Sequence, residues 1–168
     1  AMGVPLTCSV FLTHHLGIIN QALSEHASYL FQEDDNALNP GTRSLQCGRR
    51  NDALKLWAAW KYYGTEGWSQ RIDRQRALAL KLAELVSNHP RLVLIEAPPY
   101  LNVCFYHLDM DSQMICHHLQ HEQHALIGYA DVQERCIIRA AVINPCLQNK
   151  DLIQLIDAID LVATCHKN

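Results

Sequence analysis

The chain has 168 residues, which is enough for one domain with a sizeable core or for part of a larger protein. Apolar residues make up 49% of it and charged residues 18%, a composition typical of a globular protein and not of a disordered one. The formal net charge is -3 without a basic stripe, so we expect no nucleic-acid partner. No apolar run is long enough to span a bilayer, so we expect no membrane partner.

Seven cysteines are scattered along the chain, an odd number without a Cys-x-x-Cys pair. Several lie inside apolar runs, such as Val-Cys-Phe at 103–105 and Arg-Cys-Ile-Ile at 135–138. Buried, reduced thiols are typical of cytosolic proteins, whereas disulfide frameworks belong to oxidising compartments. We therefore expect free thiols and a cytoplasmic location.

The first part of the chain predicts a strand, a helix and a loop. Residues 4–15 are β-compatible and predict a strand, and residues 16–27 predict a short helix. Residues 33–43 are rich in Asn, Asp, Gly and Pro, which is typical of a loop. Asn51 is a candidate N-cap for the helix that follows, and Gly64 is a candidate stop for it.

The second part begins with another helix, from Thr65 to about Asn88, and then the apolar period changes. Strands are expected over 91–96, 102–108, 124–130 and 135–143, and helices over 111–124 and from Asn149 onward. This order predicts a small α+β unit with mixed strands and flanking helices. We expect a domain boundary near residue 62.

Arg139 is unusual because it lies among Ile, Ala and Val in a predicted strand, CIIRAAVI. An unpaired buried guanidinium is costly, so the side chain needs an anion or an exposed position. One interpretation is an internal salt bridge or a place on an edge strand. The other is a site for a ligand carboxylate, whose two oxygens match the guanidinium fork.

Three histidines, His117, His121 and His124, follow one another at i, i+4 and i+7, on one face of a predicted helix. That spacing can hold a metal ion, and a zinc site on this face is one interpretation. The stretch is one residue short of the zincin motif H-E-x-x-H. A polar helix face in contact with solvent is the plainer interpretation, and we expect no metal.

Tyr29 lies in a polar context, HASYLFQED, just before the predicted loop. Its ring can pack on the surface while its hydroxyl meets water. Alternatively, the phenol can sit on a mobile lid and deliver a proton when the lid closes. The residue pattern alone does not choose between these interpretations.

Several segments together resemble a known family: MGVPLTCSVFL (2–12), HASYLFQED (26–34), LQCGRRNDALKLWAAWKYYGTEG (45–67), NVCFYH (102–107) and IIRAAVINP (137–145). In this order they are similar to the C-terminal part of the group II pyridoxal-phosphate-dependent decarboxylases, especially glutamate decarboxylase and cysteine sulfinate decarboxylase. The resemblance implies an α/β protein with the fold type I of pyridoxal-phosphate-dependent transferases. Residues 1–62 would be the end of the large cofactor-binding domain, including the catalytic loop, and residues 63–168 the small α+β C-terminal domain.

The resemblance also implies roles for individual residues. Tyr29 matches the tyrosine of a loop that closes over the active site and protonates the substrate α-carbon after carbon dioxide leaves. Arg139 matches the arginine that binds the substrate carboxylate. The lysine that forms the Schiff base with pyridoxal 5'-phosphate is expected immediately before Ala1, so the chain as given lacks it. A homodimer with shared active sites is implied as well.

The function implied is that of a carboxy-lyase for a small acidic amino acid, first of all L-glutamate, giving 4-aminobutanoate and carbon dioxide. Aspartate, cysteine sulfinate and 2,4-diaminobutyrate are the alternative substrates. A non-catalytic α+β interaction module is the alternative from another class of protein. The span over residues 108–127 is shorter than in the animal enzymes, and no role is carried over to it.

Overall fold

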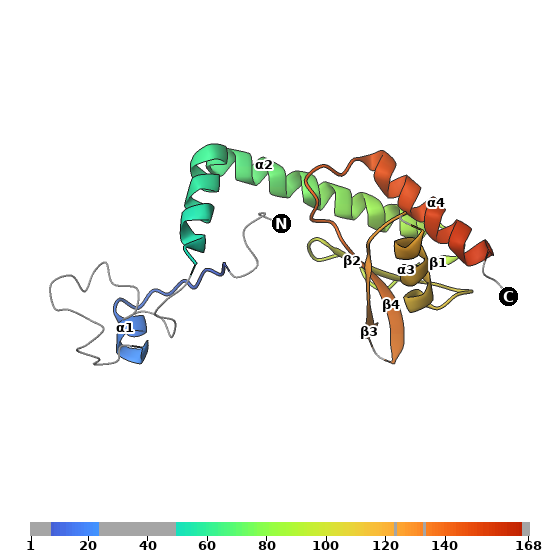
Figure 1. Cartoon of the computed structure of the whole chain (residues 1–168), viewed down its shortest axis with the longest axis horizontal. Coiled ribbons are helices and arrows are strands. Elements are labelled where there is room, and N and C mark those ends of the chain that lie inside the picture. Colours follow the sequence, from blue (N-terminus) through green and yellow to red (C-terminus); the bar gives the residue numbers. More distant parts are fainter. Residues whose placement is uncertain (1–7, 24–49, 123, 133, 166–168) are drawn as a thin grey trace. The chain divides into compact units, whose positions relative to one another are not determined.

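The computed structural model describes residues 8–23, 50–122, 124–132 and 134–165 (Figure 1). The chain divides into two compact units, one within residues 3–62 and the other within residues 63–168. Each unit is described by itself below. None of the helices in the described part of the chain is long and apolar enough to cross a membrane.

The first unit contains the helix α1, Ile18–Leu23, which begins after Gly17 at φ 77°. The helix prediction for residues 16–27 is confirmed over these six residues, and its last four lie outside the described residues. The strand predicted for 4–15 is wrong over its described part, because residues 8–15 adopt no strand. Phe11 is 75% exposed there. A β-compatible segment forms a strand only beside a partner, and none lies beside this one in the described part.

The helix α2, Asp52–Asn88, is two helical segments separated at Gly64. Gly64 has φ 67° and ψ 176°, a backbone region that is essentially open to glycine alone. The predicted stop at this residue is therefore confirmed. The predicted N-cap is confirmed as well, since Oδ1 of Asn51 accepts a hydrogen bond from the Leu54 amide at 3.2 Å.

The second unit contains a four-stranded sheet in the order β1-β2-β4-β3. The strands are β1 Leu92–Leu94, β2 Asn102–His107, β3 Gly128–Val132 and β4 Arg135–Ala141. All three neighbouring pairs are antiparallel, so the prediction of mixed strands is wrong. The short connections from β1 to β2 and from β3 to β4 explain this, because a short connection can join only antiparallel neighbours.

One face of the sheet is covered by helices, as Figure 1 shows for α3, Ser112–His121, and α4, Asn149–Cys165. Core residues come from the strands, both of these helices and the second segment of α2; they include Leu82, Val86, Phe105, Leu119, Ile138 and Ile159. The apolar face predicted for the last helix is buried through Leu152, Ile156 and Ile159. Because side chains alternate along a strand, the residues between the core positions point to the opposite face. We call this opposite side of the sheet, on which Arg139 is exposed and Ile137 is buried, the open face.

Candidate functional site

Arg139 lies in the middle of β4, which is an inner strand of the sheet. Its neighbours in the chain, Ile138 and Ala140, are buried in the core, whereas Arg139 is exposed on the open face. Within the described ranges, its guanidinium makes no ion pair. The position is thus neither an edge strand nor one half of an internal salt bridge in this part of the chain.

Two small neutral residues flank Arg139 on the adjoining strands. Gly128 pairs with it from β3 and Cys104 pairs with it from β2. A Cβ atom placed on Gly128 would lie 3.8 Å from Nη2 of Arg139, so the guanidinium extends over the glycine. Burial raises the pKa of the Cys104 thiol, against the opposing effect of the Arg139 charge and with a contribution from Glu96. The thiol is therefore protonated at neutral pH and offers the guanidinium no anion.

Tyr29, the other predicted site residue, lies outside the described residues, as does the predicted loop over 33–43. The lysine expected to hold the cofactor would precede Ala1. The structure thus places Arg139 alone among the predicted site residues. The exposed guanidinium of Arg139, unpaired among the described residues, supports the carboxylate-binding interpretation, which remains a prediction.

The histidine-rich helix α3 carries no metal-binding constellation. Among the described residues there is no group of three or more His, Cys, Asp or Glu side chains that could hold a metal ion. Nε2 of His124 lies 3.3 Å from a carboxylate oxygen of Glu122, and the ring of His117 lies 6.0 Å from that of Tyr129. These are the contacts of a polar helix surface.

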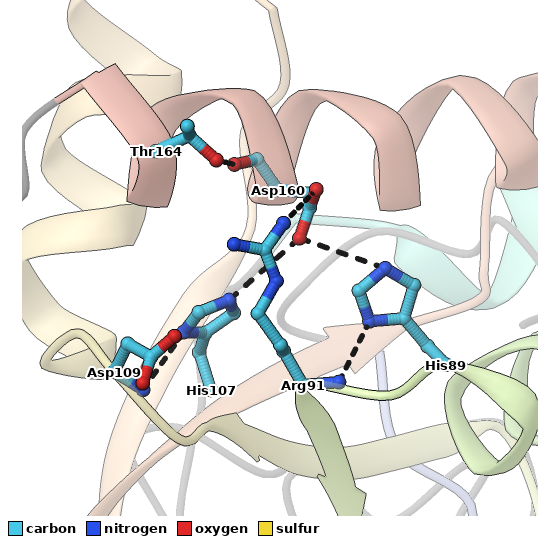
Figure 2. Close-up of polar contacts among 6 residues, drawn as sticks. All are labelled: His89, Arg91, His107, Asp109, Asp160 and Thr164. Atoms are coloured by element: carbon cyan, nitrogen blue, oxygen red, sulfur yellow. Dashed lines mark hydrogen bonds and ion pairs between the residues drawn. The ribbon is translucent and has the colours of Figure 1, made fainter.

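Sequence reasoning missed a polar cluster around Asp160 of α4, which Figure 2 shows. Its carboxylate forms an ion pair with Arg91, at the start of β1. Oδ1 of the same carboxylate lies 3.6 Å from Nε2 of His89 and 3.9 Å from Nε2 of His107. These residues are too far apart in the chain for any sequence pattern to join them. The cluster ties the last helix to the end of the sheet.

Backbone amides donate hydrogen bonds to the Nδ1 atoms of both imidazoles in this cluster. Nδ1 of His89 accepts a hydrogen bond from the Arg91 amide at 3.3 Å, and Nδ1 of His107 accepts one from the Asp109 amide at 3.1 Å. Each neutral ring therefore carries its proton on Nε2, the atom that faces Asp160. A metal ion would need an unprotonated Nε2 as its ligand, so the cluster fits a structural role and not a metal site.

A depression of about 400 Å³ lies where β2 and β4 meet the start of α3. Its charged lining comprises Asp109, Asp111, Glu134 and Arg135. Oδ1 of Asp111 already accepts hydrogen bonds from the amides of Gln113 and Met114, at 2.9 and 3.2 Å. With three carboxylates against one guanidinium and the helix amides occupied, the depression does not fit the phosphate of the expected cofactor.

The fold of this chain also occurs in enzymes of known structure. The crystal structure of mouse CSAD in apo form is 26% identical, with a TM-score of 0.77, over 89% of this chain and 34% of that chain. The glutamate decarboxylase domain of the diaminobutyrate-pyruvate transaminase and L-2,4-diaminobutyrate decarboxylase from Vibrio parahaemolyticus has a TM-score of 0.64 at 22% identity, over 69% of this chain and 26% of that chain. The fold is that of the pyridoxal-phosphate-dependent decarboxylases, fold type I.

The sequence leads to the same class. Residues 1–108 match the pyridoxal-dependent decarboxylase conserved domain, and the chain belongs to that family. The acidic amino acid decarboxylase GADL1 of Bos taurus is 30% identical over 176 residues, 92% of this chain and 34% of that protein. The cysteine sulfinic acid decarboxylase of Mus musculus is 31% identical over 183 residues, 96% of this chain and 37% of that protein. The L-aspartate decarboxylase dtxS4 of Metarhizium robertsii is 41% identical over 110 residues, 63% of this chain and 22% of that protein. The chain thus spans about a third of the length of the curated relatives that it matches along most of its own length.

Proposed function

We propose that the protein is a pyridoxal-phosphate-dependent decarboxylase of a small acidic amino acid and that Arg139 binds a carboxylate of the substrate. The observation that carries this proposal is an exposed guanidinium on an inner strand, with no internal anion among the described residues. An exposed guanidinium without an internal anion is available to bind a carboxylate from outside. Family membership supplies the class of reaction.

The role of Arg139 in this proposal is to orient the substrate. A guanidinium donates two parallel hydrogen bonds to a carboxylate and so fixes the plane of that group as well as its position. Lysine carries the same charge on a single point and fixes no plane. Holding the amino acid in one orientation selects which bond at its α-carbon is ready to break. Arg139→Lys should therefore keep part of the binding and lose more of the turnover.

The first experiment compares Arg139→Gln with Arg135→Gln in the full-length protein, with carbon dioxide release as the readout. Both arginines are exposed on β4 and both point to the open face, but the guanidinium of Arg135 stacks on the ring of Tyr106 at 4.2 Å. We expect kcat/KM to fall about 100-fold or more in Arg139→Gln, because a charge-assisted bidentate contact is lost. Arg135→Gln should stay within about threefold of the parent, as a surface substitution does. Equal effects of the two substitutions would remove Arg139 from the substrate site.

For the substrate, we propose L-glutamate first, with 4-aminobutanoate as the product. Relatives whose names specify acidic amino acids, aspartate and cysteine sulfinic acid support the acidic class and leave the chain length of the substrate open. A panel of glutamate, aspartate, cysteine sulfinate and 2,4-diaminobutyrate, assayed for carbon dioxide release, ranks them. Preference for the cationic 2,4-diaminobutyrate would contradict the acidic class.

We propose Tyr29 as the proton donor to the substrate α-carbon after carbon dioxide leaves. The proposal follows from the match of HASYLFQED to the catalytic loop of the family. Tyr29→Phe removes the phenol proton and keeps the ring. We expect slower decarboxylation and a larger share of abortive transamination. Unchanged partitioning between the two outcomes would exclude Tyr29 from this step.

The cofactor, the lysine that binds it and the dimer belong to the same proposal. We place the lysine immediately before Ala1 and expect a cytoplasmic homodimer with shared active sites. The alternative of a non-catalytic interaction module makes the opposite prediction for cofactor binding. A visible absorbance band that borohydride abolishes, with the reduced cofactor retained on one lysine, would exclude the interaction module. The absence of cofactor from the purified full-length protein would favour the interaction module.

A further inference from the structure

Arg139 belongs to a row of side chains that crosses the open face of the sheet. Cys104 lies directly opposite Arg139 on β2, and Gly128 lies directly opposite it on β3. Side chains that are directly opposite on neighbouring antiparallel strands have their Cβ atoms about 4.5–5.5 Å apart. The size and charge of these two neighbours therefore decide whether the guanidinium has an ion-pair partner on the adjoining strands.

Neither neighbour competes for the charge of Arg139. Gly128 has no side chain, and the guanidinium reaches to within 3.8 Å of the place where its Cβ would be. Cys104 is half-buried, and its thiol stays protonated, because the loss of hydration outweighs the nearby positive charge. A carboxylate at either place would instead lie within reach of the guanidinium and form an ion pair.

We propose that Cys104 and Gly128 are positioning residues, whose small size and lack of charge keep the guanidinium of Arg139 unpaired and reserve it for the carboxylate of the substrate. This inference rests on the proposed function of Arg139. It adds that neither residue directly opposite Arg139 carries a charge, and that Glu96, whose charge reaches Cys104, forms no ion pair with Arg139 in the described part of the chain. It also explains why an arginine on an inner strand has no partner inside the described unit.

The test places an anion in this row and compares it with a neutral side chain of the same shape. Cys104→Asp and Cys104→Asn are made in the full-length protein and assayed with the preferred amino acid of the panel. We expect KM to rise about threefold to tenfold in Cys104→Asp, the factor that a partly exposed ion pair supplies, with kcat recovered at saturating substrate. Cys104→Asn has the same shape as the Asp variant without the charge, so its KM should stay below that of Cys104→Asp by this factor.

A pH profile separates competition from a merely structural effect. The KM of Cys104→Asp should fall back toward that of the parent as the pH drops toward the pKa of the new carboxyl, because protonation removes the internal competitor. Cys104→Asn should show no such change relative to the parent. Equal KM values of the Asp and Asn variants over the whole pH range would overturn the inference.

Gly128 offers a second, independent pair of variants if a substitution at Cys104 disturbs folding. An added Cβ meets only ordinary van der Waals neighbours there, and Gly128→Asp and Gly128→Asn differ from each other in charge and not in shape. We expect the same contrast, a higher KM for Asp than for Asn. If Arg139→Gln lowers kcat/KM but neither Asp variant differs from its Asn control, this inference fails and the proposed function stands. If Arg139→Gln has no effect, the proposed function fails first.

Discussion

Replacing Asp160 by Asn should destabilise the second unit by about 1–2 kcal/mol. The carboxylate lies 28% exposed in its ion pair with Arg91, whose side chain is 32% exposed. Breaking a fully buried pair costs about 3–5 kcal/mol and breaking an exposed pair about 0–1 kcal/mol, so an intermediate burial gives an intermediate loss. The amide keeps the shape of the side chain but removes the charge that faces Arg91, His89 and His107.

The matched control is Glu84→Gln, which removes the carboxylate from the ion pair with Lys81 on α2. These side chains are 57% and 40% exposed, so the loss should stay below about 0.5 kcal/mol. The assay is urea unfolding of the full-length protein, followed by circular dichroism at neutral pH, with midpoints compared at a common slope. Equal midpoint shifts in the two variants would refute the argument that burial sets the strength of the Asp160 pair.

Three further predictions concern the pH response and the packing of the second unit. Burial lowers the pKa of His107, against the Asp109 charge and with the help of the Arg91 charge. The folded protein therefore protonates His107 at a lower pH than the unfolded chain, in which the pKa of histidine is about 6.5. Stability should therefore fall as the pH drops below about 6.5, and urea midpoints from pH 8 to 5 should show a shallower fall in His107→Asn, whose side-chain oxygen can still accept the Asp109 amide. Gly64→Ala should cost about 1–3 kcal/mol in the same urea unfolding assay, because only glycine accepts its backbone angles, whereas Gly128→Ala should be nearly neutral. Ile138→Ala should cost about 2–5 kcal/mol in urea, because it opens a cavity in the fully buried core; a loss below about 1 kcal/mol would contradict its central packing.

The sequence predicted the helices and strands of the second unit well because each has a strong local signal. The face of α4 that carries Ile156 repeats at helical spacing, and Asn51 and Gly64 mark helix ends through their own backbone chemistry. The segment over 8–15 failed because β propensity describes how a residue fits into a sheet and not whether a partner strand exists. The antiparallel pairing was missed for the same reason, since pairing is a property of two segments.

Arg139 could be found from the sequence because a lone charge within an apolar strand needs an explanation. Its freedom from partners could not be found, because that depends on Cys104 and Gly128, which lie on other strands. The Asp160 cluster is the extreme case, with His89, Arg91 and His107 brought to α4 only by the packing of the whole unit. Sequence reasoning therefore singled out Arg139 and missed the residues that lie opposite it on the adjoining strands.

The order in which the strands pair has a consequence for how the second unit folds. Val132 pairs with Arg135 across a tight hairpin, whereas Phe105 pairs with Ile138 across an intervening helix and strand. Closing the longer loop costs more chain entropy before any contact repays it, so the two hairpins should form early and join each other late. The pairing of Cys104 with Arg139 belongs to the β2–β4 ladder, which forms late. A newly synthesised chain would thus acquire its two hairpins before Cys104 and Arg139 come together, and hydrogen exchange during refolding would show the amides of the β2–β4 pairing as the last to gain protection.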